Sequence, residues 1–274
     1  MTDSNTTLRQ PVIFVGHGSP MNVVEDNDFR AAWQGLGTEF GPQARWPRPK
    51  AILCISAHWV TEGWWLTAMA QPRTIHDFGG FPQVLFEQQY PAPGAPELAL
   101  SWSQTLRQAH DQSPLGLDTD WGLDHGCWGV LKPMFPQADI PVLQLSIDLS
   151  RPGPEHLAMG RQLRALREQG VLIVASGNIV HNLSVRNAQA TEQEAYEWAL
   201  VFDQWVCESL ASGDVDRLAR FESLGALMQK AHPSIEHYLP LLYAVGARDA
   251  DEPVVTFNDA WQMASIDMRS FIWG

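Results

Sequence analysis

The chain has 274 residues, of which 45% are hydrophobic and 18% are charged, and its formal net charge at pH 7 is -13. This composition supports a sizeable buried core and excludes a largely disordered chain. The negative charge argues against a nucleic-acid partner, because no cluster of Lys and Arg is available to neutralise phosphates. No apolar run reaches the roughly 18 residues of a membrane-spanning helix, so we expect no membrane partner.

The ends of the chain and its cysteines suggest how it is organised and where it works. Residues 1–10 are polar and lack the apolar segment of a signal peptide, so we expect a flexible tail there. The 3 cysteines are widely spaced and form no Cys-x-x-Cys pair, which favours reduced thiols and a cytoplasmic location. No linker or repeat divides residues 11–274, which we expect to form a single domain. A homo-oligomer is compatible with these features.

Short apolar runs separated by polar turns open the N-terminal half. They predict a strand at Pro11–Val15 and a short helix at Asp28–Gly35. Ala51–Ile55 is an unbroken apolar run, which is typical of a strand buried on both faces. Trp64–Met69 follows as an expected strand partner.

Two segments rich in glycine and aromatic residues come next. Pro72–Pro82 is an irregular loop of the kind that covers a site. Its Asp77-Phe78-Gly79 mimics a kinase motif, but neither a Gly-rich loop nor a catalytic Asn accompanies it, so we interpret the match as accidental. Pro96–His110 has the pattern of an amphipathic helix, and Asp118–Val130 reads as a second loop that carries His125.

Strands and helices also alternate in the C-terminal half. Thr191 and Glu194 have the spacing of a capping box, which predicts a helix over Thr191–Leu210. Ser234 is expected to cap a helix over Ser234–Val245. The remaining expected elements are strands at Val142–Ile147, Val171–Ala175, Val254–Phe257 and Ala264–Met268, and helices at Glu155–Glu168, Asp214–Phe221 and Leu224–Lys230. This order predicts an α/β domain whose mostly parallel central sheet is flanked by helices.

Three of the predicted buried strands end in turns that contain a histidine. His17 follows the first strand, His58 follows Ala51–Ile55, and His181 follows Val171–Ala175. In open parallel sheets, ligands bind beyond the carboxyl ends of the strands, so we expect the site at this edge. Neutral imidazole is a ligand suited to zinc and to iron(II), and these histidines are therefore candidate metal ligands.

The fourth candidate ligand comes from the helix predicted at Ser234–Val245. His237 lies in its first turn, and Glu236 is its rival. Adjacent helical residues point about 100° apart, so only one of the two is expected to face a metal.

The other histidines are expected to have different roles. His110 and His156 lie on exposed helix patterns and His232 precedes a proline, so we interpret these three as structural. His125 is a candidate acid–base residue, with a structural role as the alternative. No Gly-x-Ser-x-Gly elbow is present, so we interpret the serines near these histidines as turn residues.

At this point the chain resembles the class III extradiol ring-cleaving dioxygenases, and especially the 4,5-DOPA extradiol dioxygenase branch. The resemblance extends over nearly the whole chain and rests on the combination of its motifs. They are Gly16-His17-Gly18-Ser19-Pro20-Met21-Asn22, Ser56-Ala57-His58-Trp59, Ile75-His76-Asp77-Phe78-Gly79-Gly80-Phe81-Pro82, Tyr90-Pro91-Ala92-Pro93-Gly94, Asp124-His125-Gly126, Trp128-Gly129, Gln144-Leu145-Ser146-Ile147-Asp148, Ser176-Gly177-Asn178, His181-Asn182-Leu183 and Glu236-His237-Tyr238-Leu239-Pro240-Leu241.

The resemblance implies one divalent metal held by His17, His58 and His237. It also implies that His181 is either a further ligand or the first choice for acid–base catalyst, and that His125 lies on the substrate side and is the second choice. Many relatives use two histidines and a glutamate around iron(II), whereas His237 occupies the matching position here. An all-histidine site suits Zn(II) at least as well as Fe(II).

The resemblance further implies that the chain inserts O2 into a catechol such as L-DOPA to give a muconic semialdehyde. Candidates for an aromatic wall around the ring are Trp59, Phe78, Phe81 and Trp128. Two alternatives stay open. One is a zinc-dependent hydrolase that uses metal-bound water, and the other is a non-catalytic binding protein of the same fold.

Overall fold

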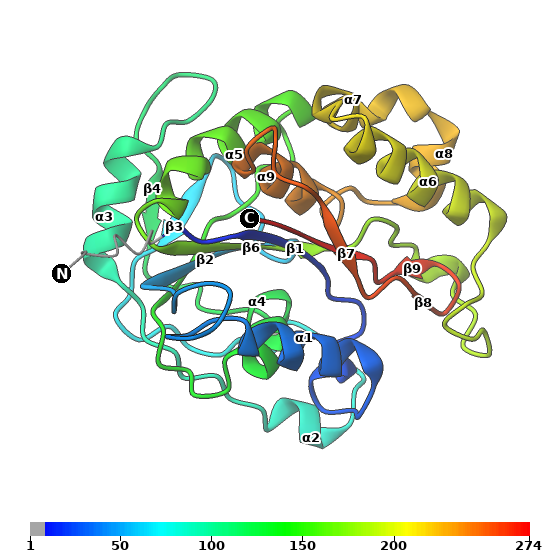
Figure 1. The fold of residues 1–274 in the computed structure, drawn as a ribbon, viewed down its shortest axis with the longest axis horizontal. Helices are drawn as coiled ribbons and strands as arrows, with labels where there is room; N and C mark the ends of the chain where they lie inside the picture. Colours follow the sequence, from blue (N-terminus) through cyan, green and yellow to red (C-terminus); the bar gives the residue numbers. More distant parts are fainter. Residues whose placement is uncertain (1–8) are drawn as a thin grey trace.

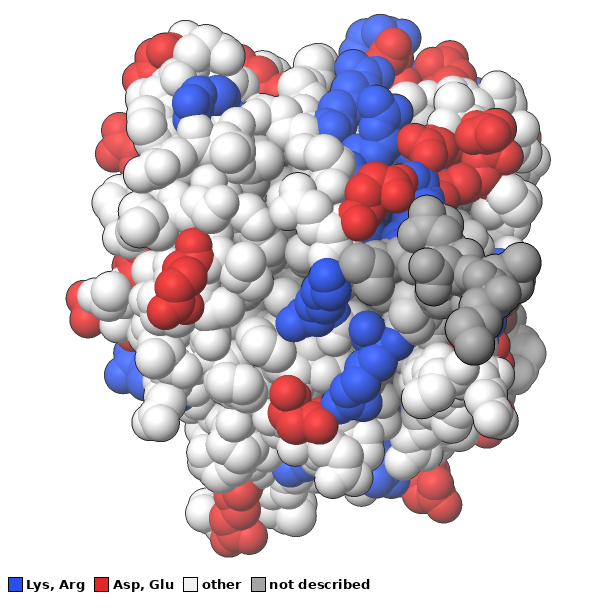
Figure 2. Space-filling view, turned by 60° about the vertical axis from the view of Figure 1, so that its left-hand side comes forward, with Lys and Arg blue, Asp and Glu red and all other residues white. Residues whose placement is uncertain are grey.

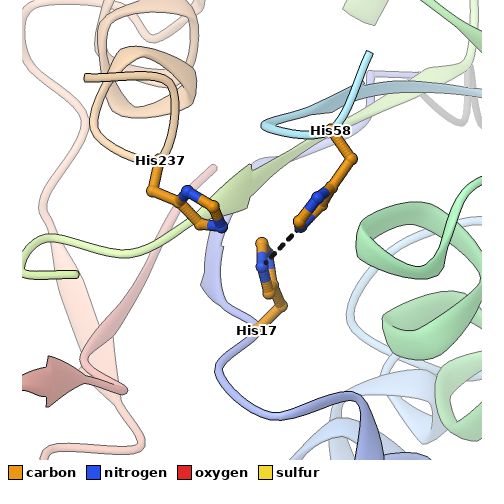
Figure 3. A group of neighbouring side chains, drawn as sticks. All are labelled: His17, His58 and His237. Atoms are coloured by element: carbon orange, nitrogen blue, oxygen red, sulfur yellow. Dashed lines mark hydrogen bonds between the residues drawn. The ribbon is translucent and has the colours of Figure 1, made fainter. Parts of the chain in front are cut away.

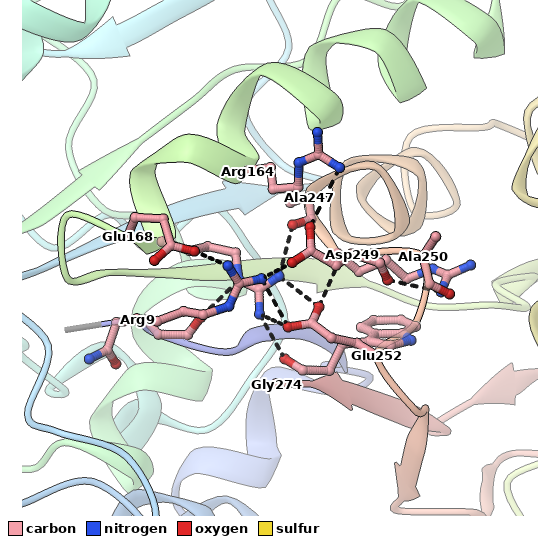
Figure 4. Close-up of polar contacts among 12 residues, drawn as sticks. Arg9, Arg164, Glu168, Ala247, Asp249, Ala250, Glu252 and Gly274 are labelled. Carbon is pink, nitrogen blue, oxygen red and sulfur yellow. Dashed lines mark hydrogen bonds and ion pairs between the residues drawn. The ribbon is translucent and has the colours of Figure 1, made fainter. Parts of the chain in front are cut away.

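A computed structural model describes residues 9–274. The expected flexible tail therefore falls mostly outside the described residues. At its end, Arg9 pairs with the carboxylates of Glu168, Asp249 and Glu252 (Figure 4), and Gln10 is buried.

A six-stranded sheet crosses the molecule, with strand order β5-β2-β6-β1-β10-β7 (Figure 1). The first four strands in this order are parallel, and β10 and β7 run antiparallel to their neighbours. Their bounds are β1 Val12–Gly16, β2 Ala51–Ser56, β5 Val142–Gln144, β6 Val171–Gly177, β7 Val255–Phe257 and β10 Ser270–Trp273. The predicted α/β fold with a mostly parallel central sheet is confirmed.

Helices cover both faces of this sheet, so the side chains of its strands point alternately into two apolar cores (Figure 1). In β1, Val12 and Phe14 belong to one core, and Ile13 and Val15 belong to the other. The helices on the first side are α5 Gly153–Arg167, α6 Glu197–Ala211 and α9 Leu239–Ala247; those on the second are α1 Asp28–Thr38 and α4 His125–Met134. Burial on both faces explains why the central strands are apolar throughout.

Shorter elements surround this framework. They are β3 Trp65–Thr67 paired with β4 Gly116–Asp118, β8 Trp261–Gln262 paired with β9 Ile266–Asp267, the helices α2 Gln83–Phe86, α3 Pro96–Thr105, α7 Val215–Ala219 and α8 Ala226–Ala231, and the 3₁₀ turns Pro20–Val23, Leu183–Val185 and Phe221–Leu224. No helix within residues 9–274 is long and apolar enough to cross a membrane. On the face shown in Figure 2, acidic and basic side chains lie beside one another.

The segment expected to be a second loop, Asp118–Val130, is half helix. Helix α4 begins at His125, and the Asp124 carboxylate caps it by accepting the N–H of Cys127 at 3.2 Å. Two glycines and Pro133 weaken the helical signal in the sequence. Burial against the sheet and the Asp124 cap stabilise the helix despite these residues.

Two predicted helices begin later than expected. The Glu194 carboxylate accepts the Thr191 N–H at 2.7 Å, as in a capping box, but it closes a turn, and α6 begins at Glu197. Ser234 does not cap a helix, because its hydroxyl donates to Glu236 at 2.8 Å. Helix α9 begins at Leu239, with a proline in its first turn, where the missing N–H costs no hydrogen bond.

The edges of the sheet also differ from the prediction. The expected strand at Trp64–Met69 is short and pairs with β4 outside the central sheet. The expected edge strand at Ala264–Met268 forms only β9, which pairs with β8. The sequence reading missed β10, which lies between β1 and β7. Helix α3 ends at Thr105 instead of His110.

Candidate functional site

The carboxyl ends of three parallel strands meet at one edge of the sheet. In the strand register, Gly16 of β1 lies beside Gly177 of β6, and Ser56 of β2 lies beside Ser176. Because the strands end level, the residues that follow them are brought together, as the sequence predicts.

Gly177 brings the segment before α9 to the same edge. A Cβ atom at this position would lie 2.2 Å from the carbonyl oxygen of His237, so only glycine permits the close approach. The next residue, Asn178, donates its N–H to that carbonyl at 2.8 Å. The end of β6 therefore positions His237 beside the strand-end histidines.

His17, His58 and His237 form one cluster (Figure 3). A ring nitrogen of each lies within 4.8 Å of a ring nitrogen of the other two, and the Nε2 atoms of His17 and His58 are 3.2 Å apart. The three rings come from the end of β1, the end of β2 and the turn before α9. Of the two candidates Glu236 and His237, it is the His237 ring that joins this cluster.

Each of the three rings has an oxygen partner at Nδ1. The Ser176 hydroxyl lies 2.9 Å from Nδ1 of His17, an Asp77 carboxylate oxygen lies 3.4 Å from that of His58, and a Glu236 oxygen lies 3.2 Å from that of His237. Such outer partners fix the orientation of a ring and leave Nε2 for a ligand.

The environment of the cluster favours neutral imidazoles. Burial lowers the pKa of His17 and of His237 well below 6.5, and the neighbouring histidines lower both further. Burial also lowers the pKa of His58, to about 3. The Nε2 atoms of His17 and His58 lie within hydrogen-bonding distance of each other, and a cation between the three rings would bind a lone pair of each. Their number and chemistry fit one divalent zinc or iron ion.

His181 lies beside this cluster but is not one of its three members. Its ring stacks face to face on His237, with ring centroids 3.6 Å apart and an interplanar angle of 7°. Burial lowers its pKa to about 4, so this ring is neutral at pH 7 and able to accept a proton.

His125 lies on the other side of the cluster, with its ring centroid 3.9 Å from that of His58. Asp77 holds it twice: one carboxylate oxygen accepts the backbone N–H of His125 at 2.9 Å, and the other lies 2.9 Å from its Nδ1. Burial tends to raise the pKa of Asp77, but the hydrogen bonds from His125 outweigh it and lower this pKa to about 2. The charged carboxylate therefore keeps a proton on Nδ1 and leaves the Nε2 lone pair for a substrate.

Asp77 is the functional candidate that the sequence reading missed. It belongs to a motif that carries the family resemblance, but the sequence analysis assigns it no role. Asp77 and His125 are 48 residues apart, and no local pattern connects them. The usable signal was an acid in a Gly-rich loop expected to cover the site.

The imidazoles lie in a cavity of about 560 Å³. Its lining residues are His17, Gly18, Ser19, Pro20, His58, Phe78, Gly79, Gly80, Phe81, His125, His181, Leu183, Arg186, His237, Met263 and Ile266. The loop predicted at Pro72–Pro82 thus contributes its aromatic tip to the wall.

Two of the aromatic candidates do not line this cavity. Trp128 is fully buried, and its indole N–H donates to the carbonyl of Ile75 at 2.8 Å. It lies behind Phe78, with ring centroids 6.3 Å apart. Trp59 is buried and stacks on Trp121.

The histidines expected to be structural lie away from the cluster. His156 is fully buried, not exposed as its helical pattern suggested, and its Nδ1 lies 2.8 Å from the hydroxyl of Tyr243. His232 is buried with Nε2 2.6 Å from the carbonyl oxygen of Ile179. His110 is exposed and lies 3.4 Å from Asp111.

Comparison with known proteins gives matches over most of the chain. The family model for the catalytic LigB subunit of aromatic ring-opening dioxygenase matches residues 11–266. The 4,5-DOPA dioxygenase extradiol of Escherichia coli K12 is 46% identical over 97% of this chain and 95% of its own length. That of Beta vulgaris is 34% identical over 94% of each chain. A crystal structure of an uncharacterized protein from E. coli K12 superposes with a TM-score of 0.81 at 40% identity, covering 97% of this chain and all of that one.

Proposed function

The chain belongs to the LigB family of aromatic ring-opening dioxygenases and is an extradiol dioxygenase, and from this premise we propose that its substrate is a catechol such as L-DOPA. The product would be a muconic semialdehyde. The observation that carries the proposal is the convergence of three neutral imidazoles from separate elements at the base of one cavity. The names of the relatives from E. coli and Beta vulgaris support L-DOPA as the first substrate to test.

His17, His58 and His237 would hold the metal in this proposal. When bound, a divalent metal brings the catechol and O2 together and mediates electron transfer between them. We propose Fe(II) for ring cleavage, with Zn(II) as the ion that the same three nitrogen donors bind equally well. Ser176, Asp77 and Glu236 would orient the three rings through Nδ1.

The walls of the cavity would orient the ring of the substrate. Phe78 and Phe81 line the cavity and meet edge to face, with centroids 5.5 Å apart. A flat aromatic ring packs well against such surfaces, and their apolar character excludes water from the reacting centre. Trp128, which was expected to contact substrate, is assigned the indirect role of supporting Phe78 from behind.

The proposal assigns the movement of protons to two histidines. We propose that Nε2 of His125 removes a proton from a catechol hydroxyl, because Asp77 keeps the proton of that ring on Nδ1. His181 lies on the opposite side of the cluster, stacked on His237. It would accept the proton of the second catechol hydroxyl, and both protons would return to the product as the ring opens. Its role as an acid–base group is preferred to one as a ligand, because its ring lies against the face of His237.

The test begins with metal-free protein loaded with Fe(II) in the absence of oxygen. L-DOPA is then added and air is admitted, and oxygen uptake and a yellow ring-opened product are recorded. We expect stoichiometric oxygen uptake that His17→Ala and His58→Ala abolish. No oxygen uptake with any catechol, despite one bound iron per chain, would overturn the proposal.

Two further arms separate the alternatives. Zinc-loaded protein is screened against esters and amides, because a zinc hydrolase would act on these without oxygen. A non-catalytic binding protein would bind catechols without consuming them. The proposal also places the enzyme in the cytoplasm, as its free thiols Cys54, Cys127 and Cys207 suggest. A homo-oligomer stays a prediction for size measurement in solution.

A further inference from the structure

The cavity contains one permanently charged side chain among the described residues that line it, and this is Arg186. No Asp or Glu belongs to the lining set. In a chain of net charge -13, a cavity lined by an arginine and by no carboxylate favours a negatively charged substrate group over a positively charged one. Apart from the imidazole nitrogens that would hold the metal, the one fixed charge of the lining attracts an anionic group.

Arg186 and the imidazole cluster occupy different depths of this cavity. His17 and His237 are buried at 4% and 5% exposure, whereas Arg186 is exposed and follows the 3₁₀ turn Leu183–Val185. The histidines therefore form the floor, and Arg186 stands at the mouth.

The shape of a catechol matches the separation between the histidines at the floor of the cavity and Arg186 at its mouth. Its two hydroxyls are on adjacent ring carbons, so a ring whose diol faces the floor can carry a side chain that points toward the mouth. Between floor and mouth, the apolar groups of Phe78, Phe81 and Met263 line the cavity. They suit the hydrocarbon part of such a side chain.

The side chain of Arg186 makes few polar contacts with the rest of the described protein. One guanidinium nitrogen, Nη1, donates to the carbonyl of Leu183 at 3.1 Å. No ion pair joins Arg186 to a carboxylate in the part of the chain that the structure describes. Its planar fork of N–H donors matches the two oxygens of a carboxylate.

We propose that Arg186 is a specificity-determining residue that binds the side-chain carboxylate of the catechol substrate. The inference rests on the proposed function and deepens it. The preferred class is a catechol with a short carboxylate-bearing side chain. The amino group of an amino-acid substrate is not recognised, because no acidic side chain lines the cavity.

The test compares four catechols on the iron-loaded enzyme. L-DOPA and 3-(3,4-dihydroxyphenyl)propionate carry the carboxylate, and dopamine and 4-methylcatechol lack it. We expect kcat/KM to be similar for the two carboxylates and about tenfold higher than for the other two, the effect of one charge-assisted hydrogen-bonded contact. Equal kcat/KM for L-DOPA and dopamine would overturn the inference.

Three variants assign the effect to this side chain. Arg186→Gln should raise KM for the two carboxylates about tenfold and leave dopamine and 4-methylcatechol unchanged, whereas Arg186→Lys should retain part of the preference. The matched control is Arg220→Gln, since Arg220 is an exposed arginine outside the cavity lining. The ratio of substrates within one variant does not depend on how much of it is folded. An unchanged ratio in Arg186→Gln would contradict the assignment.

A binding measurement separates this inference from the ring-cleaving function. Calorimetric titration with 3-(4-hydroxyphenyl)propionate and with tyramine uses monophenols that share a ring and differ in the charge of the side chain. Tighter binding of the propionate, lost in Arg186→Gln, supports the inference even if no catechol is opened. Equal binding of the two would overturn it even if catechols are opened.

Discussion

Two buried polar clusters lie at opposite edges of the central sheet. At the edge where the parallel strands begin, Arg167 donates to the carbonyls of Gln10 at 2.8 Å and Ala247 at 3.0 Å, and to both oxygens of Glu252 at 2.7 and 2.5 Å (Figure 4). At the edge where they end, His17, His58 and His237 point their nitrogens toward one another (Figure 3).

The two clusters differ in how their buried polar atoms find partners. All three guanidinium nitrogens of Arg167 donate to acceptors, so the buried charge is satisfied within the protein. The imidazoles are buried with ring nitrogens close together, the Nε2 atoms of His17 and His58 at 3.2 Å, and a cation would bind a lone pair of each ring. The first cluster ties the ends of the chain to α5 and α9. The histidine cluster lowers the stability of the metal-free chain, and the same arrangement forms a binding site.

The largest effect is expected at the histidine end. His17→Ala removes one of three ligands and should lower metal content and ring cleavage by more than about 100-fold, since even outer partners of ligands are worth 10- to 100-fold. The unfolding free energy of the metal-free variant should stay the same or rise, because a crowded ring is removed. Metal analysis and urea unfolding of metal-free protein measure the two effects. His110→Ala, an exposed histidine far from the cluster, is the control and should change neither.

The reverse pattern is expected at the arginine end. Arg167→Met leaves the carbonyls of Gln10 and Ala247 without this donor and removes the buried cation that pairs with Glu252. Glu252 keeps the contacts from Arg9 and from the Asp249 N–H, and we expect the unfolding free energy to fall by about 3 kcal/mol. Metal content per folded molecule should not change. Arg164→Gln, which breaks an exposed pair with Asp249, is the matched control and should cost less than about 1 kcal/mol. A metal deficit in Arg167→Met would show that the two edges are coupled.

The same contrast explains what the sequence could predict. Strands β1, β2 and β6 are contiguous apolar runs because both of their faces are covered, so their ends and His17, His58 and His181 could be located by pattern alone. In contrast, β10 is a four-residue strand directly after Arg269, and α4 contains glycines and a proline. Tertiary packing stabilises both elements, and a local pattern does not report it.

Contacts between segments that are far apart in the chain are the second feature that the sequence does not predict. Nothing local indicates that Asp77 meets His125, or that Gly177 brings in the backbone of His237. The sequence analysis includes Trp128 among the candidates for an aromatic wall around the substrate ring. The helix at His125–Met134 turns it instead toward Ile75 and into the core. Side-chain direction depends on the secondary structure, which was wrongly predicted there.

A smaller effect is expected from the support of the histidine cluster. Asp77→Asn removes the charge that fixes the His125 tautomer and should lower kcat by about 10- to 100-fold, with a smaller change in KM. Asp77→Glu keeps the charge and should recover part of the rate. Asp120→Asn, at an exposed acid outside the cavity lining, is the control. A loss of kcat that is equal in Asn and Glu variants would indicate a merely structural role for Asp77.

The last effect concerns acid, which should act on one cluster and spare the other. Burial lowers the pKa of His58 to about 3 and that of His181 to about 4, against about 6.5 in the unfolded chain. Between the folded-state pKa of each ring and the unfolded value of about 6.5, the unfolded chain binds protons that the folded chain does not. The unfolding free energy therefore falls as the pH falls below about 6.5. Glu252 is partly buried, which would raise its pKa, but hydrogen bonds from Arg167 lower this pKa to about 2. The stability that ionised Glu252 contributes is therefore fully present above about pH 4.5 and is lost only toward pH 2.

Metal-free protein unfolded with urea at pH 7.5 and pH 5.5 measures this difference. Each histidine that is neutral in the folded chain should lower the unfolding free energy by about 1.4 kcal/mol over this interval. The double variant His17→Gln/His58→Gln should show a smaller dependence on pH, because two of these groups are gone. Arg167→Met should show the dependence of the unmodified chain, because it leaves the histidine cluster unchanged. If the double variant kept the full dependence, protons would be acting elsewhere, and the buried, neutral state of the cluster would be wrong.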